Sequence, residues 1–247
     1  NLIRRIYAGV PAPEQSDHID RAVDAVGRSL ARLLSAVPAS HAIGLFDGFG
    51  PTWRHHLYPA YKATRPPMPE PLAQNMSRME AAFATAGAHP HRVANYEADD
   101  VIASVAVKAS QRGAQVVIVS TDKSMLTLLG PRVRVRNHFD DKFVDDTDVH
   151  NRFGVSAKDL ELFLALVGDS GQGIPGVPGI GAKTAARLVN EYPTLSALLD
   201  AADSISGRTG KALAKGRQEA ELSLTLTRLD RGVDVGLNLR ECRISPT

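Results

Sequence analysis

The chain has 247 residues, with 29 lysines and arginines against 27 aspartates and glutamates, so its formal net charge is +2. Hydrophobic residues make up 43% and charged residues 23%, as in ordinary globular proteins. No apolar run reaches the roughly 18 residues of a membrane-spanning helix, and the first residues lack the apolar stretch of a signal peptide. A single cysteine, Cys242, excludes an internal disulfide and a cysteine-based zinc site. We therefore expect a soluble protein of a reducing, cytoplasmic compartment.

The beginning of the chain is abrupt. It starts with Asn1 rather than methionine, and Leu2, Ile3 and Ile6 already follow the pattern of a packed segment. We expect further residues to precede Asn1.

Helices and short strands alternate along the first half. Apolar residues at helical spacing predict a helix over residues 17–37, which Pro38 ends. The apolar run 41–46 is too short for a helix and predicts a buried strand. A second helix is predicted over residues 97–112, followed by strands at 116–120 and near Val133 and Val135. This alternation favours an α/β fold with a mostly parallel sheet.

The second half has a different character. From Ser156 onward the patterns are helical, and a glycine- and proline-rich hairpin spans Gly173 to Gly181. Leu160, Phe163, Leu164 and Val167 have the spacing of core residues. We expect two domains, an α/β domain over residues 1–150 and a helical domain over residues 151–247.

Acidic side chains gather where the predicted strands end and the helix between them begins. Ligands of an open parallel sheet bind beyond the carboxyl ends of its strands, and clustered carboxylates need a cation such as Mg²⁺ or Mn²⁺. Taken singly, each acid has an ordinary explanation as a turn residue, a helix cap or a first-turn acid. Together they predict a divalent-metal site. The six candidates are Asp47, Glu97, Asp99, Asp100, Asp122 and Asp169.

A basic segment without any acid spans residues 53–65. Cations suit phosphates and aromatic faces suit bases, so the segment fits a nucleic-acid contact. The alternative is a solvated loop whose aromatic side chains lie in the core. Prolines that follow from Pro66 onward make a stiff connection rather than a continuous helix. The cations are Arg54, Lys62 and Arg65, and the interleaved aromatics are Trp53, Tyr58 and Tyr61.

The hairpin is a more specific signal. Its glycines allow close approach to a phosphate, and a helix starting near Ala182 would present free N–H groups. This helix-hairpin-helix pattern grips a DNA backbone without reading bases; the alternative is a plain turn. The candidate contacts are Gly176, Gly179, Gly181, Lys183 and Thr184, with Arg187 on the same helix. A further basic stretch, Arg208 to Arg217, fits either a DNA contact or a solvated helix face.

Six motifs in this order strongly resemble the flap endonuclease/5′-3′ exonuclease family, which includes the N-terminal nuclease domain of bacterial DNA polymerase I. The match covers nearly the whole chain and looks like a stand-alone bacterial member of the exonuclease IX type. The motifs are Phe46-Asp47, Tyr61 to Glu70, Glu97 to Asp100, Ser120 to Lys123, Val167 to Ser170, and Ile174 to Gly181.

The resemblance implies a PIN-like α/β nuclease domain with a helical arch, followed by a helical domain with a helix-3-turn-helix DNA clamp. It implies action on DNA with 5′ flaps, gaps or single-strand/duplex junctions. We expect the protein to be a monomer. Matched by position, Asp47, Glu97 and Asp99 would serve a first divalent ion, with Asp100 beside them. Asp122 and Asp169 would serve a second ion. Lys62 and Arg65 would contact the scissile phosphate, and the hairpin would hold duplex DNA around a K⁺ ion bound by backbone carbonyls and the Ser170 hydroxyl.

Three departures from the family pattern leave two hypotheses open. The family's first strand, which ends in a metal-binding aspartate, would precede Asn1; Ser124 and Gln172 stand where the family has acids. Each loss removes an anionic ligand, although Ser124 and Gln172 could still hold a metal through water. One hypothesis is a divalent-metal-dependent 5′ nuclease whose metal-bound water attacks near Asp47 and Asp99. The other is a DNA junction-binding protein with weakened or lost nuclease activity.

Overall fold

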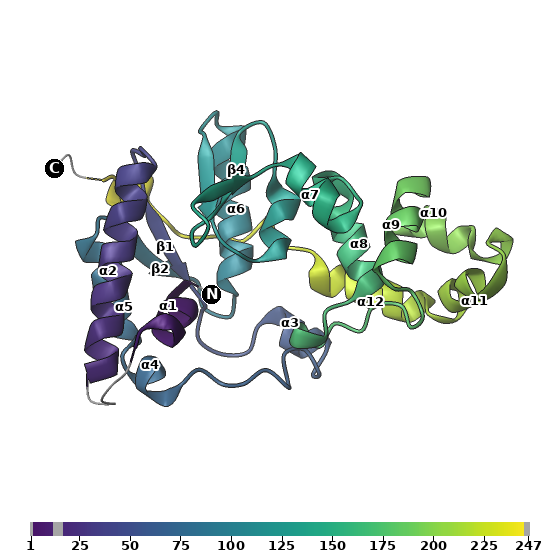
Figure 1. Cartoon of the computed structure of the whole chain (residues 1–247), viewed down its shortest axis with the longest axis horizontal. Coiled ribbons are helices and arrows are strands. Elements are labelled where there is room, and N and C mark those ends of the chain that lie inside the picture. Colours follow the sequence, from purple (N-terminus) through teal and green to yellow (C-terminus); the bar gives the residue numbers. More distant parts are fainter. Residues whose placement is uncertain (1, 12–16, 245–247) are drawn as a thin grey trace. The chain divides into compact units, whose positions relative to one another are not determined.

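The computed structural model describes residues 2–11 and 17–244, so Asn1 lies outside the described residues (Figure 1). Contacts divide the chain into two compact units. The first unit comprises residues 1–50, 66–101 and 234–247, and the second comprises residues 51–65 and 102–233. Within the described ranges, none of the helices combines the length and hydrophobicity needed to cross a membrane.

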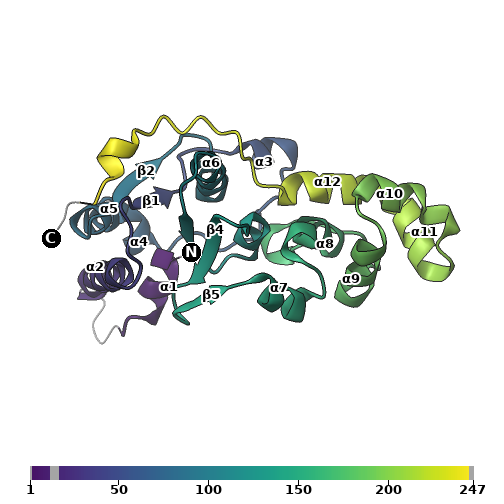
Figure 2. The same cartoon turned by 90° about the horizontal axis from the view of Figure 1, so that it is seen from above.

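The first unit packs two long helices beside a pair of strands. The helix predicted over residues 17–37 is confirmed as α2, which buries Ala22, Val26, Leu30 and Leu33 on one face. This face packs against α5, and α5 in turn contacts β2; Figure 2 shows α2 and α5 side by side. The elements are α1 (Leu2–Gly9), α2 (His18–Ala36), β1 (Ile43–Phe46), α4 (Glu70–Gln74), α5 (Met76–Thr85) and β2 (His89–Arg92).

The strands β1 and β2 form a parallel pair in which Ile43 lies opposite His89 and Phe46 opposite Arg92. The predicted strand at 41–46 is therefore confirmed in its apolar part. The ring of Phe46 meets that of Phe83 on α5 edge to face, with centroids 5.0 Å apart. A side chain at Gly44 would come within 2.3 Å of the Phe83 ring, which explains the glycine in the strand.

The last described residues return to this unit. Ala42 N donates to the carbonyl of Cys242, and Ile244 N donates to the carbonyl of Ser40. The short helix η6 (Leu239–Cys242) buries the cysteine. Burial and the nearby Glu241 carboxylate raise the pKa of the Cys242 thiol, which disfavours the reactive thiolate.

The second unit begins with strands and continues as helices. The predicted strands are confirmed: β3 pairs in parallel with β4, and β5 joins β4 in antiparallel fashion. In the described residues the strands thus form two sheets rather than one. The helix predicted over 97–112 is confirmed as α6, which begins in the first unit and ends in the second. The elements are α3 (Trp53–Leu57), α6 (Ala98–Gln111), β3 (Val116–Val119), η2 (Lys123–Leu128), β4 (Val133–Asn137), β5 (Lys142–Val144) and α7 (Asp146–Phe153).

The helical pattern predicted from Ser156 onward is confirmed. The helix α8 buries Leu160, Phe163 and Leu164, and the half-buried Val167 packs against the same core. In this part of the unit α8 packs against both α9 and α12 (Figure 1). The elements are η3 (Ala157–Asp159), α8 (Leu160–Val167), η4 (Ser170–Gln172), α9 (Ala182–Glu191), α10 (Leu195–Asp200), η5 (Ala202–Ser204), α11 (Gly207–Lys215) and α12 (Arg217–Thr227).

Candidate active site

Four predicted acids belong to the first unit and form the first carboxylate group: Asp47, Glu97, Asp99 and Asp100. Asp47 follows β1 directly, and its Oδ1 accepts a hydrogen bond of 2.9 Å from the backbone N of Ala98, where α6 begins. Asp99 and Asp100 lie in the first turn of that helix, where the helix dipole favours negative charge. Glu97 is only 7% exposed and Asp100 is fully buried. The hydrogen bond from Ala98 N to Asp47 therefore joins the end of β1 to the start of α6, the two segments that carry these acids.

Close backbone contacts link the residues after β1 to the segment that leads into α6. Gly48 N donates to the carbonyl of Tyr96 over 2.8 Å, and a side chain at Gly48 would lie 2.0 Å from the carbonyl oxygen of Val93. Only glycine allows such an approach. Arg92 also donates to the Asp47 carbonyl over 2.9 Å and pairs with Glu80. Burial lowers the pKa of Arg92, while the Asp47 carboxylate opposes that shift.

Two predicted acids belong to the second unit and form the second carboxylate group, Asp122 and Asp169. Asp122 caps η2: its Oδ1 accepts hydrogen bonds from the backbone N of Ser124 at 3.0 Å and from the Ser124 hydroxyl at 2.9 Å. The simpler alternative for Asp122, a helix cap, is therefore present in the structure. Ser124, which stands where the family pattern has an acid, donates both of these hydrogen bonds to the Asp122 carboxylate.

Asp169 pairs with a residue that sequence analysis did not single out. Lys123 Nζ lies 2.8 Å from Asp169 Oδ2, and their side chains are 31% and 21% exposed. Partial burial raises the pKa of Asp169, but the hydrogen bond and charge of Lys123, together with the backbone N–H groups of Gln172 and Gly171, outweigh it. The net pKa lies below its ordinary value. The only sequence signal for Lys123 was its place directly after Asp122.

The basic segment 53–65 differs from the prediction in part. Arg54 is only 2% exposed, and it donates to the carbonyls of Leu226 and Arg228, each over 2.8 Å, at the end of α12. Tyr61 is 3% exposed and packs with Ile174 and Leu226. The predicted DNA contacts of Arg54 and Tyr61 are therefore corrected, because buried groups cannot reach a phosphate or a base. Tyr61 follows the alternative in which the aromatics lie in the core.

Lys62 and Arg65 remain accessible. Lys62 is half-buried, with Nζ 5.0 Å from the Tyr61 ring centre, and Arg65 is exposed. The five-residue α3 is the only helix between residues 51 and 69, all of which the structure describes, and turns follow it in place of a longer helical arch. The prolines that follow from Pro59 onward explain why no helix continues.

Gln172, at the second position where the family pattern has an acid, anchors this segment. Its side-chain Oε1 accepts a hydrogen bond of 3.1 Å from the Tyr61 hydroxyl. Its carbonyl accepts one of 2.8 Å from Lys62 N. The backbone approach is so close that a side chain at Gly173 would lie 2.4 Å from the Ala60 carbonyl oxygen. Lys62 itself has a left-handed backbone, with φ of 54°. Gln172 thus fixes the backbone that carries Lys62.

The hairpin has a buried base and an open tip. Val177 and Ile180 are buried in the core of the second unit, and Gly176 N donates to the Ser223 hydroxyl over 2.9 Å. Gly176 is buried, so the structure assigns it to packing rather than to the predicted DNA contact. A side chain there would lie 2.6 Å from the backbone of Val167.

The tip of the hairpin exposes Gly179 and Gly181 and leads into α9, which begins at Ala182 as predicted. Its N-cap is Gly181, which has no side chain that could cap the first N–H groups of the helix. Lys183 is exposed and Thr184 is half-buried in the first turn. Backbone N–H groups at such a helix start can bind an anion.

The second basic stretch lies beside this tip. A side chain at Gly179 would be 3.8 Å from Cβ of Ala212 on α11. Arg208, Lys211 and Lys215 are exposed on or at the end of the same helix. Arg217, by contrast, lies 3.4 Å from Asp200 and 3.8 Å from Glu221. The exposed cations of α11 and the hairpin tip thus share one surface, defined here as the hairpin surface.

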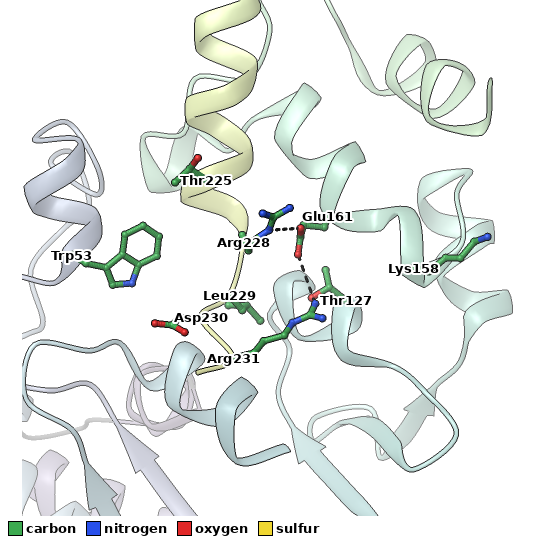
Figure 3. A pocket seen from close by; sticks show the side chains of 9 residues that line it. All are labelled: Trp53, Thr127, Lys158, Glu161, Thr225, Arg228, Leu229, Asp230 and Arg231. Atoms are coloured by element: carbon green, nitrogen blue, oxygen red, sulfur yellow. Dashed lines mark hydrogen bonds and ion pairs between the residues drawn. The ribbon is translucent and has the colours of Figure 1, made fainter. Parts of the chain in front are cut away.

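A cavity of about 600 Å³ lies elsewhere in the second unit. Its wall carries an ion-pair cluster in which Glu161 lies 2.9 Å from Arg228 and 3.7 Å from Arg231 (Figure 3). Figure 3 also shows Trp53 facing the chain that leaves α12. None of the predicted carboxylates lines this cavity.

The two carboxylate groups differ in their fitness for a divalent ion. The first contains four carboxylates, and carboxylate oxygens are the ligands that Mg²⁺ and Mn²⁺ prefer. The second offers only two carboxylates, with Ser124 bonded to one and the Lys123 ammonium to the other. In the described part of the chain, no three histidine, cysteine, aspartate or glutamate side chains form a group that could hold a metal ion.

Comparison with protein families matches the whole chain. A family described as 5′-3′ exonuclease, N-terminal resolvase-like domain, matches residues 1–154. One described as 5′-3′ exonuclease, C-terminal SAM fold, matches residues 155–247. Relatives named flap endonuclease Xni include one from Shewanella amazonensis, 36% identical over all of this chain and 96% of its own length. Another, from Aeromonas hydrophila, is 40% identical over all of this chain and 93% of its own length.

Solved structures share the fold. A bacteriophage T5 5′-exonuclease with bound zinc has a TM-score of 0.72 at 22% identity, over 84% of this chain and 81% of its own. A T5 flap endonuclease in complex with DNA and metal ions has a TM-score of 0.68 at 24% identity, over 86% of this chain and 80% of its own. These likenesses and the two family matches confirm the predicted fold class, a PIN-like α/β domain followed by a helical domain.

Proposed function

Because this chain belongs to the 5′-3′ exonuclease family, we propose that it is a divalent-metal-dependent 5′ nuclease that hydrolyses DNA at 5′ flaps, gaps and single-strand/duplex junctions. The names of its curated relatives support this activity. The observation that carries the proposal is the first carboxylate group, in which Asp47 is hydrogen-bonded to the start of the helix that bears Asp99 and Asp100.

In this proposal the first carboxylate group holds Mg²⁺ or Mn²⁺. Carboxylate oxygens are the ligands that these hard cations prefer. A divalent ion there supplies Lewis acidity and an activated water for phosphodiester hydrolysis. The Ala98 N–H fixes one oxygen of Asp47, so that ligand is already oriented before an ion binds.

Lys62 and Arg65 provide positive charge for the scissile phosphate. Phosphoryl transfer depends mainly on positioning and on stabilising negative charge in the transition state. The hydrogen bond from Lys62 N to Gln172 fixes the backbone of Lys62. Arg65 is exposed and free to approach DNA.

The hairpin surface binds the duplex in this proposal. The open start of α9 and the cations of α11 suit a phosphate backbone, and such contacts carry no sequence information. We further propose that backbone carbonyls of the hairpin and the exposed Ser170 hydroxyl hold a K⁺ ion, and that the protein acts as a cytoplasmic monomer.

The test is cleavage of a 5′-labelled flap duplex in Mg²⁺ and separately in Mn²⁺, using a full-length protein that includes any residues before Asn1. The parent should cut near the junction in at least one metal, and Asp99→Ala should lose that activity. Asp148→Ala is a matched control, since Asp148 is an exposed acid in the first turn of α7. Equal cutting by Asp99→Ala and the parent contradicts the assignment.

A second function is favoured by the second carboxylate group. Ser124 is hydrogen-bonded to Asp122 and Lys123 is ion-paired with Asp169, so this group has fewer ligands to offer than a two-metal nuclease requires. In this alternative the protein binds junctions without cutting them. Salt-dependent binding of flap DNA, with no turnover in either metal, would favour it.

A further inference from the structure

An exposed aromatic ring follows the first strand of the first carboxylate group. Phe49 is 74% exposed, more than any other large hydrophobic side chain in the described residues. It follows Asp47 by two residues, and two residues of chain span at most about 7 Å. Phe46, on the other side of Asp47, is only 6% exposed and packs inside the unit. The chain thus passes from a buried ring to an open one within the segment that carries a candidate metal ligand.

Contacts with the rest of the first unit hold the open ring in place. The Phe49 carbonyl accepts a hydrogen bond of 3.2 Å from the backbone N of Asn95. The Arg92 guanidinium lies 4.5 Å from the centre of the Phe49 ring, within the range of a cation–π contact. Arg92 also donates to the Asp47 carbonyl over 2.9 Å, and its side chain is only 23% exposed. The cation therefore covers one face of the ring, and the large exposed fraction leaves the other face open.

We propose that Phe49 stacks on an unpaired nucleobase of the DNA strand whose phosphate is bound at the first carboxylate group. The inference deepens the proposed function, on which it rests, because it names a residue that holds a base beside the reacting phosphate. Stacking on an aromatic ring tolerates every base, since each base has a π-face. Phe49 thereby holds the strand without adding sequence specificity, and the Arg92 guanidinium adds positive charge beside the same ring.

The surroundings of the ring favour a nucleobase over a protein partner. Asp47, Gly50 and Asn95, which lie beside Phe49 in the chain or bond to its backbone, are all exposed, and none has a large apolar side chain. A lone ring buries far less area than the roughly 800 Å² per partner of a stable protein interface. One planar base, in contrast, needs only one open face. Successive nucleotides of a stacked strand rise by about 3.4 Å, so a base close to the bound phosphate lies within reach of Phe49.

The fluorescence of 2-aminopurine, which falls when this base stacks, tests the inference without reference to cleavage. A set of flap duplexes carries the base at one of the unpaired positions next to the junction, and each duplex is bound in chelator. The parent should lower the emission at one position by about twofold. Phe49→Leu keeps an apolar side chain but lacks a π-face, so it should restore the emission. Phe49→Tyr should lower it as the parent does.

Phe139→Leu is the matched control. Phe139 is also an exposed ring, at 41%, but it lies in the turn between β4 and β5 of the second unit. This variant should lower the emission as the parent does. Melting curves show whether each variant is folded, and Phe49→Leu should melt like the parent because the ring that it removes is mostly exposed.

Single-turnover cleavage gives a second reading. Phe49→Leu should cut an ordinary flap about tenfold more slowly than the parent, because one stacking contact is lost. The parent should slow by the same factor on a flap with an abasic site at the quenched position. Phe49→Leu should slow no further on that flap, because the variant and the abasic site remove the same contact.

Equal quenching by the parent and a folded Phe49→Leu protein would overturn the inference, as would rate losses of the variant and the abasic site that add fully. A parent that cuts flaps, with neither effect at Phe49, would refute the inference alone. Quenching that depends on Phe49, with no cleavage by any protein, would refute the nuclease proposal alone.

Discussion

The hydroxyl of Tyr61 donates a hydrogen bond of 3.1 Å to the side-chain oxygen of Gln172. The contact joins the basic segment to the turn that follows Asp169, and Lys62 N reinforces it through the Gln172 carbonyl. An acid at position 172 would also accept the Tyr61 hydrogen, but it would add a charge beside a ring that is only 3% exposed. The neutral glutamine therefore serves as an anchor for the segment that carries Lys62.

Removing this hydrogen bond should weaken the unit measurably. Tyr61→Phe keeps the buried ring and deletes only the hydroxyl, so we expect a loss of about 1 kcal/mol and a fall in Tm of about 2–4 °C. Tyr192→Phe is the control, because that ring packs against the core of the same unit and its hydroxyl has no hydrogen-bond partner within the described residues. Thermal unfolding followed by circular dichroism measures both. Equal Tm values for the parent and Tyr61→Phe would show that the contact contributes nothing.

Two arginines of the basic segment should separate stability from DNA binding. Arg54→Ala leaves the carbonyls of Leu226 and Arg228 without their donor and should cost about 1–3 kcal/mol for each carbonyl. Arg65 is exposed, so Arg65→Ala should leave Tm unchanged and slow flap cleavage by about 100-fold. Melting curves and single-turnover cleavage of the two variants distinguish these roles. A stable Arg54→Ala protein with weakened DNA binding would restore the original DNA assignment of Arg54.

Arg54 and Tyr61 also show where the sequence is informative. Helices α2 and α6 and strand β3 follow from apolar periodicity, because the spacing that predicts each element is the spacing that buries it. No such local sequence pattern predicts whether a basic or aromatic side chain is exposed or buried. The partners of Arg54 are carbonyls near Leu226, far along the chain, so only the folded structure could assign it to the interior.

The same reason explains the elements that were missed. Strand β2 has the sequence His-Pro-His-Arg, without an apolar run, and exists because its backbone pairs with β1. The Lys123–Asp169 ion pair joins two motifs whose acids sequence analysis assigned to one ion, but Lys123 itself was not predicted as a partner. The acids themselves were predictable, since strand ends and helix starts are marked by local patterns. Their partners depend on tertiary packing and were not.

The hairpin surface predicts a graded salt dependence of DNA binding. Each exposed lysine that neutralises a phosphate contributes about 0.9 to the slope of log K against log salt concentration. Lys211→Ala should therefore lower the steepness by about that amount and weaken binding equally for all sequences. Arg217→Ala should leave the slope unchanged, because Arg217 is paired with Asp200 and Glu221. Fluorescence anisotropy with a flap duplex in chelator, over a series of salt concentrations, measures the slope. Identical slopes for the parent and Lys211→Ala would remove α11 from the DNA interface.

The Lys123–Asp169 pair should make stability depend on pH in a defined direction. The pKa of Asp169 is lowered in the folded protein from its ordinary value of 3.8, because Lys123 and two backbone N–H groups outweigh the effect of burial. A depressed carboxyl pKa stabilises the folded state fully above the unfolded pKa, and this contribution is lost as the pH falls through the folded pKa. Lys123→Met should therefore lower Tm by about 2–4 °C near neutral pH, and its Tm should approach that of the parent at a pH well below 3.8.

Melting curves in chelator across this pH range test the prediction. Lys158→Met, whose side chain is 83% exposed, should follow the parent throughout. A difference between Lys123→Met and the parent that persists undiminished in acid would mean that Lys123 stabilises the fold through its hydrocarbon chain rather than through Asp169.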